Sequence, residues 1–115
     1  MEPLSDALID QAMANFPDWS QTGDAIQRTY QFSDFVGSMR FVNEVAAAAE
    51  RDQHHPDILI RWNKVTLTLS THDAGGITEK DFDLARKCDE AAMRLGPPPK
   101  APASPAGAPA KKKSR

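Results

Sequence analysis

The sequence predicts an α+β domain: a single four-stranded antiparallel sheet with three helices on one face, in the order α-β-β-α-β-β-α. Residues 26–32 and 58–69 alternate apolar and polar side chains and contain or adjoin short turns, as paired strands do. Residues 8–16, 35–53 and 79–95 instead repeat their apolar residues at helical spacing. Because the strands pair as hairpins with a helix between them, the sheet is expected to be antiparallel and covered on one side.

The first helix is expected to begin after Ser5, a residue type that caps helix N-termini, and to stop at Pro17. Residues 18–20 form a short expected strand, and residues 21–24 read as a turn. In the strand that follows, Arg28 falls on the otherwise apolar face. Its aliphatic stem can lie along that face while its guanidinium group reaches a partner or a ligand.

The second helix is expected to take Ser33 as its N-cap, with Asp34 in the first turn, and to end near Gln53. Its predicted buried stripe consists of apolar residues at helical spacing: Phe35, Met39, Val42, Val45, Ala46 and Ala49. In the second hairpin, Asn63 and Lys64 are the expected turn residues, since Asn tolerates positive φ. Thr78 is the expected N-cap of the third helix, with Asp81 completing a capping box.

The composition divides the chain at about residue 95. Residues 1–95 have a formal charge of −7 and form the expected domain, whereas residues 96–115 have a charge of +5. This last stretch consists largely of Pro, Ala and Lys and lacks apolar periodicity, so we expect a disordered tail. The acidic domain argues against nucleic-acid binding by the folded part.

Several other classes of protein are disfavoured. No run of 18 apolar residues is present, so no membrane span is expected, and residues 1–4 do not resemble a secretory signal. Cys88 is the single cysteine, which excludes an internal disulfide and fits a reducing compartment, the cytoplasm. Its position on the apolar face of a helix indicates core packing rather than nucleophilic catalysis.

The three histidines are the strongest chemical signal. His54 and His55 lie where the second helix ends, Pro56 follows them, and His72 follows the second hairpin. Zinc is one interpretation, but adjacent histidines diverge and no established ligand spacing is present. Solvated imidazoles at a helix end are another. Because all three histidines fall within one short window, and imidazole titrates near neutrality, acid–base chemistry is a third.

A longer pattern surrounds the histidines, and it resembles the pterin-4a-carbinolamine dehydratase family. The match runs from Glu50 through His54, His55 and Pro56 to the aromatic Trp62, then to His72 and Asp81. Further similar segments are 24–26, 32–35, 63–65, 69–73 and 84–85, so that the resemblance spans about residues 4–95.

The resemblance implies both a reaction and residue roles. The family removes water from 4a-hydroxytetrahydropterin, the product of aromatic amino acid hydroxylases, and gives quinonoid dihydropterin for tetrahydrobiopterin recycling. It implies that His54 and His72 are the acid–base groups and that His55 helps to bind and polarise the pterin. Supporting groups are Pro56, Glu50, Asp81 and Trp19, although Asp18 stands where glycine is more usual before the tryptophan. No cofactor or metal is implied.

The family also implies a homodimer or homotetramer whose sheets join edge to edge. Two alternatives to this enzyme stay open at this stage. One is a non-catalytic interaction or assembly module of the same fold, of the kind found in relatives that lost the histidine motif. The other is a dehydratase-like enzyme for another pterin, such as a molybdopterin precursor.

Overall fold

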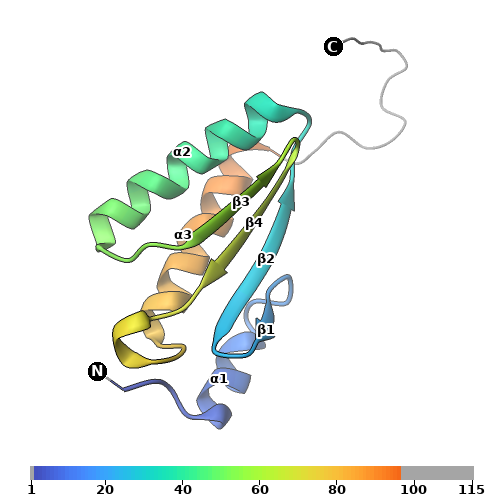
Figure 1. The fold of residues 1–115 in the computed structure, drawn as a ribbon. Helices are drawn as coiled ribbons and strands as arrows, with labels where there is room; N and C mark the ends of the chain where they lie inside the picture. Colours follow the sequence, from blue (N-terminus) through green and yellow to red (C-terminus); the bar gives the residue numbers. More distant parts are fainter. Residues whose placement is uncertain (1, 97–115) are drawn as a thin grey trace.

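The computed structural model describes residues 2–96 and contains one sheet and three α-helices (Figure 1). Helices α1 (Asp6–Met13), α2 (Phe35–Asp52) and α3 (Glu79–Leu95) alternate with two hairpins. The first hairpin consists of β1 (Ser20–Thr22) and β2 (Ala25–Gln31), and the second of β3 (Asp57–Arg61) and β4 (Lys64–Leu69). A short 3-10 helix, η1 (His72–Ala74), precedes α3. The predicted tail, residues 96–115, lies outside the described residues except for Gly96, the C-cap of α3.

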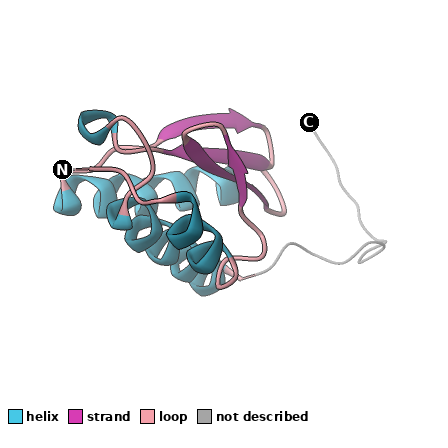
Figure 2. Ribbon diagram, turned by 90° about the horizontal axis from the view of Figure 1, so that it is seen from below, coloured by secondary structure: helices cyan, strands magenta, loops and turns pink. Residues whose placement is uncertain are grey.

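The sheet has the strand order β1-β2-β4-β3, and every neighbouring pair is antiparallel. Figure 2 shows the long helices on one side of it. The predicted fold class and element order are therefore confirmed. Because β4 pairs with both β2 and β3, it lies in the interior of the sheet, and its alternate residues Val65, Leu67 and Leu69 are fully buried.

The second hairpin turns one residue earlier than the sequence predicted. Arg61 pairs with Lys64, so the turn residues are Trp62 and Asn63, and Trp62 has the positive φ of 53°. Asn63 is held by tertiary contacts instead: its side-chain amide donates to the carbonyl of Phe32 at 3.1 Å, and its own carbonyl accepts from the Phe32 amide. These contacts fix the register against local turn preference.

The helix caps follow the sequence at two of three N-termini. Ser5 caps α1, and Thr78 caps α3 in a capping box with Asp81. The prediction of Ser33 for α2 is wrong: the N-cap is Asp34, whose carboxylate accepts from the amide of Gly37 at 2.8 Å. Helix α1 also ends at Met13, before Pro17.

The core lies between the sheet and the helices. It is aromatic near α2, where the rings of Tyr30 and Phe41 lie 4.5 Å apart between centroids, and aliphatic along β4. Cys88 is a buried free thiol on α3, and burial raises its pKa to about 12. Phe35, expected in the buried stripe of α2, is half exposed. No helix of the described part is long and apolar enough to cross a bilayer.

Candidate active site

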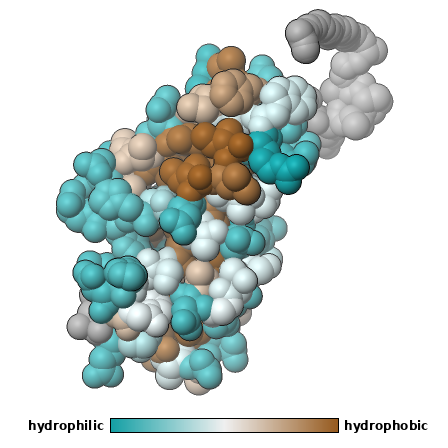
Figure 3. Space-filling view, viewed as in Figure 1, coloured by the Kyte–Doolittle hydropathy of each residue, from teal (hydrophilic) through white to brown (hydrophobic). Residues whose placement is uncertain are grey.

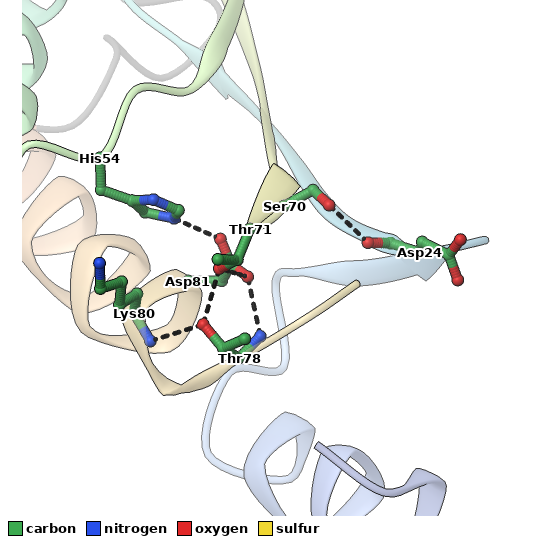
Figure 4. Close-up of polar contacts among 7 residues, drawn as sticks. All are labelled: Asp24, His54, Ser70, Thr71, Thr78, Lys80 and Asp81. Carbon is green, nitrogen blue, oxygen red and sulfur yellow. Dashed lines mark hydrogen bonds and ion pairs between the residues drawn. The ribbon is translucent and has the colours of Figure 1, made fainter. Parts of the chain in front are cut away.

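The C-terminus of α2 aims the first histidine inward. Gln53 adopts the left-handed conformation (φ 51°, ψ 44°), its amide donates to the carbonyl of Glu50, and the amide of His54 donates to that of Ala49. This is the Schellman arrangement, here with Gln in place of the usual Gly. The chain therefore reverses at residue 53 and directs the His54 side chain toward the N-terminus of α3 (Figure 4).

Asp81 receives His54 in the interior. It is fully buried (0% exposed), and its Oδ1 lies 2.6 Å from Nε2 of His54. Its Oδ2 accepts from the hydroxyl of Thr71 and from the backbone amide of Thr78, each at 2.9 Å. An ion taken out of water is tolerated only when its lone pairs are satisfied, and here each oxygen has a partner. We call His54, Thr71, Thr78 and Asp81 the His54 network.

His55 points to the surface rather than into this network. Its Nε2 lies 2.5 Å from Oε2 of Glu50, one turn back on α2, and the His55 side chain is 58% exposed. Pro56 follows and is partly exposed, and β3 begins at the next residue. The three adjacent positions 54–56 thus place one imidazole inside, one outside and a rigid residue after them.

His72 opens η1 and is exposed, with no side-chain hydrogen bond to residues 2–96. The loop beneath it is held by Thr71, whose backbone amide donates to Gly76 and whose carbonyl accepts from Ala74 and Gly75. Because Thr71 also contacts Asp81 through its hydroxyl, His72 is one residue away from the His54 network. The structure therefore brings the segments of all three histidines to one end of the molecule.

Trp19 is the predicted site residue that the structure does not bring to the histidines. It is only 3% exposed, and its indole N–H donates to both carboxylate oxygens of Asp89 at 3.1 and 3.2 Å. Asp89 lies eight residues beyond Asp81 on α3, about 12 Å further along the helix. The Trp19 ring is packed in the core. Its predicted contact with the substrate stays a prediction.

The same carboxylate also explains Arg28. Arg28 Nη1 lies 2.8 Å from Asp89 Oδ1, the hydroxyl of Tyr30 donates to that oxygen at 2.5 Å, and the guanidinium group stacks over the Tyr30 ring. Burial and then the bond to Asp89 raise the pKa of Tyr30 well above its usual range. The partner expected for Arg28 is therefore Asp89, a carboxylate that accepts hydrogen bonds from buried side chains of the same domain. We call Trp19, Arg28, Tyr30 and Asp89 the Asp89 cluster.

The sequence reasoning missed two hydroxyl groups of the site. Thr78 was expected only as a helix cap, and Thr71 was not singled out. The predicted capping box already places the Asp81 carboxylate at the backbone amide of Thr78, but it does not reveal that the Thr78 hydroxyl lies 2.6 Å from that of Thr71. The contact of Asp81 with Thr71 depends on how β4 and α3 meet, and no local pattern reveals that.

The zinc interpretation finds no arrangement to support it within residues 2–96, since no group of three His, Cys, Asp or Glu side chains there could hold a metal ion. What the site offers is a buried, carboxylate-held imidazole and two exposed imidazoles nearby. Fold and site together are typical of a small acid–base enzyme.

Comparison with known proteins gives the family. The profile described as pterin 4 alpha carbinolamine dehydratase matches residues 2–91. A protein from Nocardia farcinica, named provisionally as a pterin-4-alpha-carbinolamine dehydratase, is 55% identical over 91 residues, covering 79% of this chain and 96% of its own. One of the same name from Thermosynechococcus vestitus is 53% identical over 85 residues, covering 74% and 90%. The chain belongs to the pterin-4a-carbinolamine dehydratase family.

Two solved structures resemble the fold. A transcriptional coactivator/pterin dehydratase from Brucella melitensis superposes with a TM-score of 0.77 at 32% identity, covering 79% of this chain and 99% of that chain. A pterin dehydratase-like protein described as a RuBisCO assembly factor in the alpha-carboxysome has a TM-score of 0.54 at 21% identity, covering 64% and 86%. The second likeness concerns the fold alone.

Proposed function

We propose that this protein dehydrates 4a-hydroxytetrahydropterin to quinonoid dihydropterin, within tetrahydrobiopterin recycling after aromatic amino acid hydroxylation. The observation that carries the proposal is the buried pair of His54 and Asp81, with the loop of His72 anchored to the same network through Thr71. This arrangement supplies two imidazoles with different surroundings, as a reaction that both removes and delivers a proton requires.

In the proposed reaction, one imidazole takes the proton from ring nitrogen N5 and the other protonates the hydroxyl on carbon 4a. The C4a–O bond breaks, a double bond forms between C4a and N5, and the hydroxyl leaves as water. His54 and His72 serve as these two groups. His55, paired with Glu50 at the surface, contacts and polarises the pterin, and Pro56 fixes the backbone between the histidines and β3.

The test is a dehydration assay in which an aromatic amino acid hydroxylase supplies the carbinolamine. His54→Ala and His72→Ala should each lower kcat about 10²- to 10⁴-fold, the usual contribution of general acid–base catalysis. His55→Ala should mainly raise KM. Arg86→Ala is the matched control, because Arg86 is an exposed residue of α3 whose side chain pairs, within residues 2–96, only with the exposed Asp83.

If all three histidine-to-alanine variants fold and retain wild-type turnover, the proposal is disproved and a non-catalytic module is favoured. Turnover of other pterins, but not of this carbinolamine, would instead favour a different pterin substrate. The free thiol of Cys88 fits the reducing cytoplasm in which we place the reaction.

We further propose that the protein acts as a homodimer or homotetramer. Strand β3 is a sheet edge, and Ile58 and Leu59 on it are exposed, Leu59 by 55%. Figure 3 shows an apolar patch over the region of β3 and α2. An unpaired apolar edge favours pairing with another chain. Leu59→Lys should shift the mass measured by light scattering toward the monomer, and an unchanged mass would exclude this edge.

A further inference from the structure

The hydrogen-bond inventory around Asp81 restricts where its protons can be. An ionised carboxylate can only accept; the Thr78 amide and the Thr71 hydroxyl each have a hydrogen to give, and Nε2 of His54 has one in only one of the two neutral tautomers. The amide of Thr78 is a donor in every protonation state, and it already lies 2.9 Å from Oδ2. His54 meets the other oxygen, Oδ1, at 2.6 Å through Nε2. With Asp81 ionised, the hydrogen in that short contact belongs to His54.

The threonine hydroxyls give the network a direction. Thr71 has a single hydroxyl hydrogen, and its bond to Oδ2 of Asp81 uses it. The 2.6 Å contact between the two threonine oxygens therefore has Thr78 as donor and Thr71 as acceptor. Thr78 in turn accepts from the backbone amide of Lys80 at 3.2 Å. Figure 4 marks these contacts, and with these donor assignments each hydrogen bond in the series runs toward Asp81.

The other ring nitrogen of His54, Nδ1, lies at the boundary of the buried network. Neutral imidazole has one N–H and one lone pair, so hydrogen on Nε2 leaves the lone pair on Nδ1. Nδ1 has no hydrogen-bond partner among residues 2–96, and none of the polar side-chain atoms sealed in this part of the chain lacks one, so Nδ1 is not completely sealed from solvent although the His54 side chain is only 10% exposed. His54 lines a cavity of about 190 Å³ together with four charged residues: Asp52, Lys80, Asp83 and Lys87.

We propose that Thr71 is a positioning residue which, through Asp81, holds His54 as the Nε2–H tautomer and so makes Nδ1 the atom that accepts the proton. This inference rests on the proposed function for the identity of the proton, the one on N5 of the carbinolamine. When Nδ1 takes it, the imidazolium charge forms 2.6 Å from the Asp81 carboxylate, which stabilises it. Thr71 also anchors the η1 loop through its backbone, so one residue sets both histidine segments.

The first test needs no substrate. Long-range ¹H–¹⁵N correlation spectra of the full chain, labelled on histidine nitrogen, distinguish protonated from unprotonated ring nitrogens. At a pH where the His54 ring is neutral, we expect a hydrogen on Nε2 and none on Nδ1. A hydrogen on Nδ1 would overturn the inference, whatever the activity of the protein.

The second test separates positioning from folding. Thr71→Val keeps the shape of the side chain and its backbone bonds but removes the hydroxyl, whereas Thr71→Ser keeps the hydroxyl. For Thr71→Val we expect a second His54 tautomer to appear and kcat to fall about tenfold, the factor that corresponds to one hydrogen bond to a charged group, with KM nearly unchanged. Thr71→Ser should restore both.

Ser70→Ala is the matched control, because Ser70 is the neighbouring hydroxyl but donates outside the network, to the carbonyl of Asp24 at 2.9 Å. It should change neither the tautomer nor kcat. Wild-type kcat in Thr71→Val, or equal losses in the Val and Ser variants, would overturn the positioning role. If Thr71→Val does not fold, the Ser variant and the wild-type spectrum still decide. If even the wild type fails to dehydrate the carbinolamine, the proposed function fails while the spectra still test the network.

Discussion

Replacing Asp89 by Asn should destabilise the domain without slowing the reaction. One carboxylate of Asp89 accepts from Trp19, Tyr30 and Arg28, and the first two of these donors are buried. An amide keeps a single acceptor oxygen and turns an NH₂ group toward a donor. Because Asp89 lies in the Asp89 cluster and not in the His54 network, the damage should be confined to folding.

The magnitude follows from the partners. Hydrogen bonds to a charged group contribute about 1.5–3 kcal/mol each, but Arg28 also lies 3.7 Å from Asp18, and the Asp89 side chain is a quarter exposed, so water can replace part of the loss. We expect a net loss of about 2 kcal/mol in the free energy of unfolding, which for a domain of this size lowers Tm by about 10 °C.

The assay compares Tm, from thermal unfolding followed by circular dichroism, with kcat and KM for dehydration below the transition. Glu90→Gln is the matched control, since Glu90 is the next residue on α3, is exposed and has no side-chain bond within residues 2–96. A Tm within 2 °C of wild type, or a kcat reduced a hundredfold in folded Asp89→Asn, would refute the reasoning. Trp19→Phe extends it: a large rise in KM would show that Trp19 contacts the substrate after all.

Further predictions concern titration, reactivity, metal and the tail. The pKa of Tyr30 is higher in the native than in the unfolded state, so its contribution to stability is complete below about pH 10 and should be lost as the pH rises further. In an alkaline titration, unfolding should therefore accompany the rise in tyrosinate absorbance. Cys88 should react with a thiol reagent only as fast as the domain opens, because its pKa of about 12 and its burial suppress the thiolate; rapid labelling of native protein would contradict this. Dehydration should survive exhaustive chelation, and recovery of a lost activity by zinc would revive the metal interpretation. Truncation after Leu95 should leave Tm and turnover nearly unchanged, since residues 96–115 lack apolar side chains able to form a core; a large fall in either would show that the tail docks.

The sequence alone was sufficient for the fold class because its signals are local and consistent. Period-two and helical patterns, the caps Ser5 and Thr78, and turn residues between hydrophobic stretches all specify the same α+β arrangement. The histidine positions and the capping box of Asp81 were readable for the same reason. Local signals failed at Ser33 and at the second hairpin, where neighbouring residues offered competing caps and turns one position apart.

Tertiary structure alone decided which groups meet. His54 reaches Asp81 across 27 residues, Thr71 reaches it across 10, and Trp19 reaches Asp89 across 70. Arg28 was recognisable as an anomaly on an apolar face, but its acid was not, since α3 displays several carboxylates and only packing selects one. The physical reason is that a buried polar group needs a partner wherever the fold can supply it, and sequence periodicity records which face a residue occupies but not what lies opposite.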